Sequence, residues 1–163
     1  PTSFVRKDSK LYIHGSVGSH FLSQLKTGRS VCITVMLADE LVVAKSAFDH
    51  SVNYRSVVVF SKSEVIDDYE MKAEFFKRLT EKVVPGSWDY LRPMKKSEVD
   101  KTMLVSFDLK EASAKIRQGA PYTSESDDTK LSLWSGLIPI PSKRLTPIAD
   151  QFSQNIPLPE HLK

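Results

Sequence analysis

Short runs of β-branched and aromatic residues, separated by turn-forming residues, dominate the hydrophobic pattern of this chain. Such runs are typical of strands. The pattern predicts six of them, at residues 10–14, 30–37, 40–47, 56–66, 102–110 and 132–140. Ala38 and Asp39 stand between the second and third runs, so we expect a tight hairpin there. In the run at 102–110 apolar and polar positions alternate, which predicts an antiparallel strand with one exposed face.

Only two segments show the apolar spacing of a helix. The longer one has Asp67 as its expected N-cap, with Glu70 completing a capping box, and Pro85-Gly86 ends it. Its apolar stripe should pack on a sheet and consists of Met71, Phe75, Leu79 and Val83. The shorter helix is expected at residues 19–26, where it turns Phe21, Leu22 and Leu25 inward and stops at Gly28.

Neighbouring strands joined by hairpins, with few helices, favour an antiparallel barrel or sandwich with helices outside it. The length of 163 residues fits one domain, and we expect residues 142–163 to form an extended proline-containing tail on a domain of residues 1–141. No apolar run reaches the roughly 20 residues that cross a bilayer, so no membrane insertion is expected. A net charge of +3 without a basic cluster does not indicate nucleic-acid binding.

The single cysteine and the histidines offer little chemistry of their own. Cys32 lies in an apolar run, where we expect a buried thiol, and a chain with one cysteine suits a reducing, cytoplasmic compartment. His14, His20 and His50 lack partners at metal-ligand spacing, so no metal site is predicted. No nucleophile elbow occurs either, which ranks a hydrolase low.

Two segments could bind an anion. After His14 the chain turns through small residues, from Ser16 to Ser19, into the short helix, and backbone amides there could hold a phosphate. An ordinary strand–turn–helix junction would look the same. Arg55 stands where a buried strand is expected to begin, so its guanidinium requires an acceptor, either a phosphate or a carboxylate such as Asp49.

Taken together and in order, the motifs resemble those of the pyridoxamine 5′-phosphate oxidase-related flavoproteins, and most of all the branch of nitroimidazole-resistance (NimA-like) proteins. The resemblance runs from Pro1 to about Pro141 and rests on four stretches of sequence: "LYIHGS", "NYRSVVVF", "SAKIRQGAP" and "LWSGLIPIP". It implies an FMN-binding split β-barrel that forms a homodimer with the flavin between the subunits.

The resemblance also implies which residues contact FMN. Thr2, Ser3 and Phe4 would lie along the flavin ring, and His14 beside it as the candidate catalytic residue. The phosphate would be held by Ser16, Ser19 and His20, where relatives commonly carry Arg in place of His20. The remaining matched positions are Tyr54, Arg55, Ser56, Lys115 and Trp134. From the residues alone, Lys115 and Arg117 would be a solvated edge and Trp134 a core residue.

Three functions follow as hypotheses. The first is an FMN-dependent oxidoreductase acting on a small aromatic or nitro compound. The second is a flavin carrier, sensor or regulator without turnover. The third is an interaction protein that keeps the fold but has lost the site, for which the His20 departure is the argument from sequence.

Overall fold

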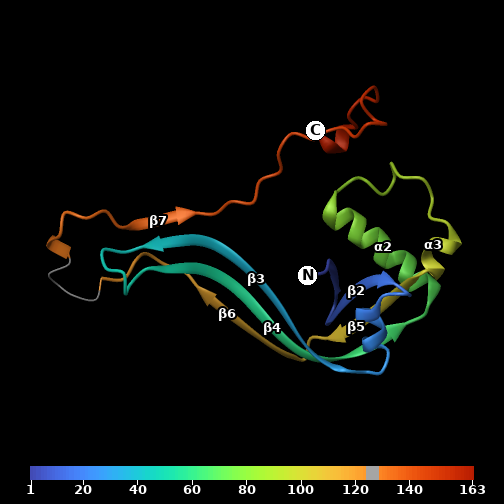
Figure 1. Cartoon of the computed structure of the whole chain (residues 1–163), viewed down its shortest axis with the longest axis horizontal. Coiled ribbons are helices and arrows are strands. Elements are labelled where there is room, and N and C mark those ends of the chain that lie inside the picture. Colours follow the sequence, from blue (N-terminus) through green and yellow to red (C-terminus); the bar gives the residue numbers. More distant parts are fainter. Residues whose placement is uncertain (124–128) are drawn as a thin grey trace. The chain divides into compact units, whose positions relative to one another are not determined.

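A computed structural model describes residues 1–123 and 129–163 of the chain (Figure 1). The chain forms two compact units. Unit 1 comprises Pro1–Val31, Phe60–Glu111 and Thr146–Lys163, and unit 2 comprises Cys32–Val59 and Ala112–Leu145. The elements are β1 Phe4–Lys7, β2 Lys10–Ser16, α1 His20–Leu25, β3 Ser30–Val43, β4 Ser51–Ile66, α2 Tyr69–Val83, α3 Lys96–Asp100, β5 Thr102–Asp108, β6 Glu111–Arg117, β7 Gly136–Pro139 and the 3₁₀ turn η2 Glu160–Leu162.

Unit 1 contains most of the hydrophobic core. β2 pairs antiparallel with both β1 and β5, and the end of β4 pairs with β5 from Ser63 opposite Phe107 onward. Helix α2 covers this sheet, because the buried ring of Phe75 packs with Val5, Tyr12 and Leu104. Three more residues of α2, Met71, Phe76 and Leu79, lie against the same cluster. The predicted apolar stripe is therefore confirmed except at Val83, which is 54% exposed.

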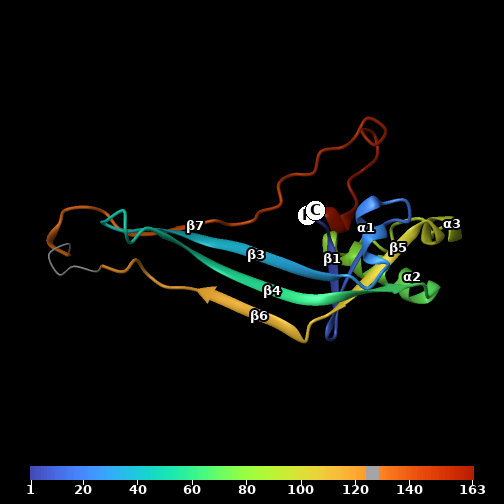
Figure 2. The ribbon, with the colours of Figure 1, turned by 60° about the horizontal axis from the view of Figure 1, so that its bottom comes forward.

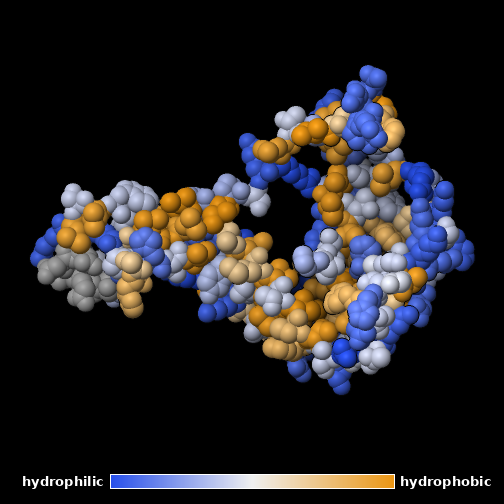
Figure 3. Space-filling model, in the orientation of Figure 1, coloured by the Kyte–Doolittle hydropathy of each residue, from blue (hydrophilic) through white to orange (hydrophobic). Residues whose placement is uncertain are grey.

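Unit 2 consists of strands without a helical cover. β3 is flanked by β4 and by β7, and β6 pairs with β4 (Figure 2). β7 is an edge strand, as its prolines predict. Of its described residues, only Val42, Ala44 and Val59 are buried apolar residues. Figure 3 shows apolar side chains gathered at the surface over this part of the chain.

The predicted hairpin at Ala38 and Asp39 is wrong, because β3 runs through both residues without a turn. Neither residue favours the positive φ that a two-residue hairpin requires. Asp39 is also held in the sheet by Arg55 of β4, and the residues after it pair with β7. The chain reverses direction instead at residues 44–50. There the Ser46 hydroxyl accepts a hydrogen bond from Asp49 N and donates one to the Asp49 carboxylate.

The predicted half-exposed strand at 102–110 is also wrong. In β5 both faces are buried from Met103 to Phe107, including Leu104 beneath α2 and the polar Ser106. Alternating apolar and polar residues imply one solvent-exposed face of a strand only when no other part of the chain covers that face. Here Ser106 is buried because its hydroxyl hydrogen-bonds Glu64 of β4 across the sheet.

Smaller differences concern single residues. Asp68, not Asp67, caps α2 by accepting from Met71 N at 2.8 Å, and Asp67 pairs with Lys72. In α1 the prediction for Leu22 and Leu25 is confirmed, but Phe21 is 60% exposed. The thiol of Cys32, expected inside, is exposed. Four short elements were not predicted: β1, β6, α3 and the 3₁₀ turn η2.

Candidate functional site

His14 near the end of β2 is the candidate catalytic residue and lies in an aromatic environment. Its ring centroid is 5.2 Å from that of Phe75 and 5.6 Å from that of Phe76, both on α2. Its Nδ1 atom is buried and has no hydrogen-bond partner among the described residues. Burial lowers the pKa of His14 below its usual value of 6.5, so the imidazole is neutral at pH 7.

This burial predicts a pH dependence of stability. Because the pKa of His14 is lower in the folded chain than in the unfolded chain, the unfolded state binds more protons near pH 6.5. The free energy of unfolding should therefore fall as pH decreases from 7 through 6. We expect His14→Gln to flatten that slope in urea melts, while His50→Gln, at an exposed position, keeps it. An unchanged slope in His14→Gln would show that other groups cause it.

The predicted phosphate segment forms a turn held by its own serines. Gly18 N donates to Ser16 Oγ at 3.2 Å, and Leu22 N donates to Ser19 Oγ at 3.3 Å as the helix cap. Both oxygens accept in these bonds, so each hydroxyl still has its own proton to donate. His20, the first residue of α1, is exposed. The turn is thus an ordinary helix start that retains donors for an anion.

The N-terminal candidates lie at the edge of unit 1. Thr2 and Ser3 are exposed, and Phe4 is the first residue of β1. Lys82 of α2 binds this strand in two ways: its Nζ lies 3.6 Å from the centroid of the Phe4 ring and donates to the Phe4 carbonyl at 2.7 Å. Lys82 was missed from sequence, since it is 78 residues away.

Arg55 on β4 is paired with a carboxylate. Its Nε and Nη2 donate to the two oxygens of Asp39 on β3, at 3.0 and 2.8 Å. The pair raises the pKa of Arg55 and lowers that of Asp39, chiefly through these hydrogen bonds. The acidic partner is therefore Asp39 rather than Asp49. Arg55 is 54% exposed, so this ion pair is not a core interaction.

The other candidates of unit 2 lie along β4 and β6. Ser56 Oγ donates to the carbonyl of Lys115 at 3.4 Å, and Lys115 Nζ is 5.9 Å from the Tyr54 ring centroid. Successive residues of a strand face opposite sides, so Arg55 is not on the face that Tyr54 and Ser56 share. Trp134 is 66% exposed, which makes the core interpretation of this residue wrong.

A buried polar network in unit 2 was missed. Asn53 of β4 is 1% exposed, and its amide donates to Glu40 at 2.7 Å and to the carbonyl of Gly119 at 3.0 Å. Arg117 donates to the Asn53 amide oxygen at 2.5 Å, so Arg117 is not part of a solvated edge. Asn53 is the third residue of β4 and lies before the predicted start of the strand at residue 56, so no local signal indicated its role.

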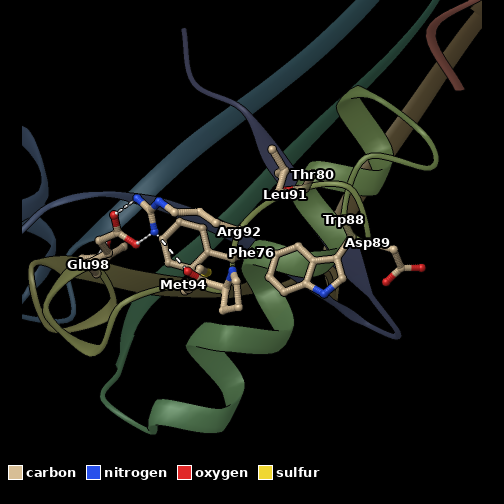
Figure 4. Close-up of a pocket in the computed structure, with 10 residues that line it drawn as sticks. Phe76, Thr80, Trp88, Asp89, Leu91, Arg92, Met94 and Glu98 are labelled. Atoms are coloured by element: carbon tan, nitrogen blue, oxygen red, sulfur yellow. Dashed lines mark hydrogen bonds and ion pairs between the residues drawn. The ribbon is translucent and has the colours of Figure 1, made fainter. Parts of the chain in front are cut away.

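A cavity of about 720 Å³ lies in unit 1, between α2, α3 and the segment that joins them (Figure 4). None of the residues implied by the resemblance lines it. Within residues 1–123 and 129–163 no three His, Cys, Asp or Glu side chains are placed to hold a metal ion. No helix in the same ranges is long and apolar enough to cross a membrane.

Comparison with known proteins places the chain in a family. The family model for pyridoxamine 5′-phosphate oxidase matches residues 1–116. The chain therefore belongs to the pyridoxamine 5′-phosphate oxidase family, which confirms the resemblance of its motifs. No curated protein matches the chain.

Solved structures match over nearly the whole chain. The flavocytochrome Anf3 from Azotobacter vinelandii is 35% identical with a TM-score of 0.88, covering 99% of this chain and 75% of its own. An FAD- and heme-binding protein from Mycobacterium smegmatis is 30% identical with a TM-score of 0.90, covering 99% and 79%. A candidate 5-nitroimidazole antibiotic resistance protein from Bacteroides thetaiotaomicron shares the fold, at 19% identity, a TM-score of 0.56 and 70% and 65% coverage. The predicted antiparallel split barrel with a few helices is thus confirmed.

Proposed function

We propose that this protein binds FMN and uses it as an oxidoreductase on a small aromatic or nitro compound. The observation that supports a flavin most strongly is the similarity to two flavoproteins, at 35% and 30% identity over 99% of the chain. A bound flavin supplies the redox chemistry, and the protein supplies orientation and charge around the ring. An exposed thiol at Cys32 suits the cytoplasmic location that we propose with it.

The candidate residues have hydrogen-bond donors that suit the phosphate of FMN. The hydroxyls of Ser16 and Ser19 retain protons for an anionic group, and Arg55 uses only Nε and Nη2 for Asp39, leaving Nη1 to donate elsewhere. The ring candidates are Thr2, Ser3 and Phe4. The remaining proposed contacts are His20, Tyr54, Ser56, Lys115 and Trp134.

His14 is the proposed catalytic group. A neutral imidazole offers one donor and one acceptor, and its buried Nδ1 makes no bond within the described chain. Nδ1 is enclosed by the chain, so the other ring nitrogen, Nε2, is the one that could hydrogen-bond the edge of a substrate without first giving up another interaction. The aromatic rings of Phe75 and Phe76 hold the imidazole in place from one side.

We propose a homodimer as the working form. Among the described residues of unit 2 only three apolar side chains are buried, while Met36, Leu41, Ile116 and Ile138 are each more than two-fifths exposed. A clustered apolar surface of this kind marks an interface. A second copy of the chain is the simplest partner, because flavin sites in this family lie between subunits, as the resemblance implies.

The test is reconstitution of the purified protein with FMN or FAD, followed by reduction without oxygen. We expect one flavin per chain with preference for FMN, and loss of the absorbance near 450 nm, the order of magnitude for an oxidised flavin, when NADH or NADPH is added. Tight binding without bleaching by either donor would favour a carrier, sensor or regulator. No binding of either flavin at tens of micromolar would reject both functions.

A heme in addition to flavin is a second candidate, favoured by the names of the two similar proteins, a flavocytochrome and an FAD- and heme-binding protein. The chain offers His14 as a nitrogen donor that is not already bonded. Titration with hemin should then give a sharp Soret band at one equivalent. A spectrum equal to that of free hemin would exclude this candidate.

A further inference from the structure

The cavity of unit 1 is built from three elements with different chemistry. Helix α2 supplies Phe76 and Thr80, and the connecting segment at residues 84–95 supplies Trp88 and Leu91. A volume of about 720 Å³ falls in the range of small-molecule sites, which is roughly 300–1,000 Å³. The lining is mostly apolar and aromatic, as in such sites.

The wall that carries Trp88 is fixed before any ligand arrives. Glu81 near the end of α2 accepts from Gly86 N and Trp88 N, both at 2.8 Å, and these two bonds lower its pKa. The ring of His161 also packs against Tyr90 of this loop, at a centroid distance of 5.2 Å and an interplanar angle of 53°. A wall that is already ordered loses little conformational freedom when a ligand binds.

The charges at the opposite end of the cavity compensate one another. Arg92 donates to both carboxylate oxygens of Glu98, at 3.1 and 2.5 Å, and also to the carbonyl of Pro93 (Figure 4). These bonds, with one from Lys95 N, lower the pKa of Glu98 to about 2, so the pair stays ionised above about pH 3. Glu98 already neutralises Arg92, so an anionic ligand would gain less here than beside an unpaired arginine.

A cationic ligand would find one carboxylate in the lining besides Glu98, that of Asp89. The carboxylate of Glu98 is occupied, and Figure 4 shows Asp89 pointing away from the other labelled side chains. Thr80 is different: it lines the cavity, and its hydroxyl makes no hydrogen bond within the described residues. A neutral ligand with one carbonyl oxygen would satisfy Thr80 and leave the Arg92–Glu98 pair intact.

We propose that this cavity is a second binding site, separate from the flavin residues, for a neutral flat aromatic compound that carries a carbonyl or amide group. Its ring stacks on the Trp88 indole and its oxygen accepts from the Thr80 hydroxyl. The site holds its ligand whether or not flavin is bound.

Equilibrium dialysis with four naphthalene compounds tests the proposal on protein saturated with FMN and on protein without it. We expect 2-naphthamide to bind one per chain with a dissociation constant below about 1 mM. Naphthalene, 2-naphthoate and (2-naphthylmethyl)ammonium should each bind at least about fivefold more weakly. Equal binding of all four, or preference for a charged one, overturns the proposal.

Variants locate the site. Trp88→Ala should weaken 2-naphthamide at least about tenfold, the effect of losing roughly 1.4 kcal/mol. Thr80→Val keeps the side-chain shape but removes the hydroxyl. In this variant 2-naphthamide should bind no more tightly than naphthalene. Phe48→Ala, on a side chain that is 91% exposed, is the control for nonspecific aromatic contact and should change nothing.

Three further outcomes are decisive. If Trp88→Ala does not fold, an unchanged amide-to-naphthalene ratio in Thr80→Val still rejects the site. If the protein binds no flavin but 2-naphthamide binding depends on Trp88, the proposed function fails and this site stands. If FMN displaces 2-naphthamide competitively, the two sites are one and the proposal is wrong.

Discussion

Leu41→Lys combined with Ile138→Lys should convert the protein to a monomer that no longer retains FMN. The two residues are opposite each other on β3 and β7, and they are 43% and 46% exposed in the single chain. Lysine at both positions costs the single chain little, because its ammonium groups stay in water. In a dimer the same positions would bury two unpaired charges, which strongly opposes association. Size-exclusion chromatography with light scattering measures the mass, and absorbance measures the flavin.

Leu145→Lys is the matched control for this double variant. It makes the same substitution in unit 2 at a residue that is 81% exposed and lies outside every strand. We expect it to remain dimeric and to bind FMN as the parent does. If the double variant also stays a dimer, these strands are not the interface. If it becomes a monomer that still binds FMN tightly, the flavin site does not lie between subunits.

Local signals predicted much of the fold. The stripe at Met71, Phe75 and Leu79 gave α2, and Ser19 gave the start of α1, because helix capping and periodicity depend on residues close in sequence. The error at Asp39 has the opposite origin. Whether the chain turns at Ala38-Asp39 or continues as a strand depends on the neighbouring strands. The residues that bond or pair with this part of β3 come from β4 and β7, which are distant in sequence.

In the candidate sites, too, local interactions could be predicted from the sequence, and interactions between distant residues could not. The turn from Ser16 to Ser19 could be predicted because its hydrogen bonds are local. Asn53 could not, since its partners Glu40 and Arg117 reach it from other strands. The cavity beside Trp88 was missed for a related reason: α3 has only five residues, too few for an apolar period, and the adjoining segment is irregular.

Arg55→Ala should weaken FMN at least about tenfold while leaving thermal stability nearly unchanged. An exposed ion pair contributes little to folding, since water and salt screen it. A phosphate or ribityl oxygen, in contrast, would lose a charged hydrogen-bond donor. Fluorescence titration of FMN gives the affinity, and differential scanning calorimetry gives the melting temperature.

Asp39→Asn separates the two roles that the arginine could have. Arg55 lowers the pKa of Asp39, so the pair is intact at neutral and mildly acidic pH and competes there with any other acceptor. Removing the negative charge of Asp39 should free the guanidinium and tighten FMN binding, opposite in sign to Arg55→Ala. If the ion pair only joins β3 to β4, the two variants should instead lower the melting temperature alike and leave the FMN affinity unchanged. Opposite signs for the two variants would therefore assign Arg55 to the flavin, because a purely structural pair responds in the same way to the loss of either partner.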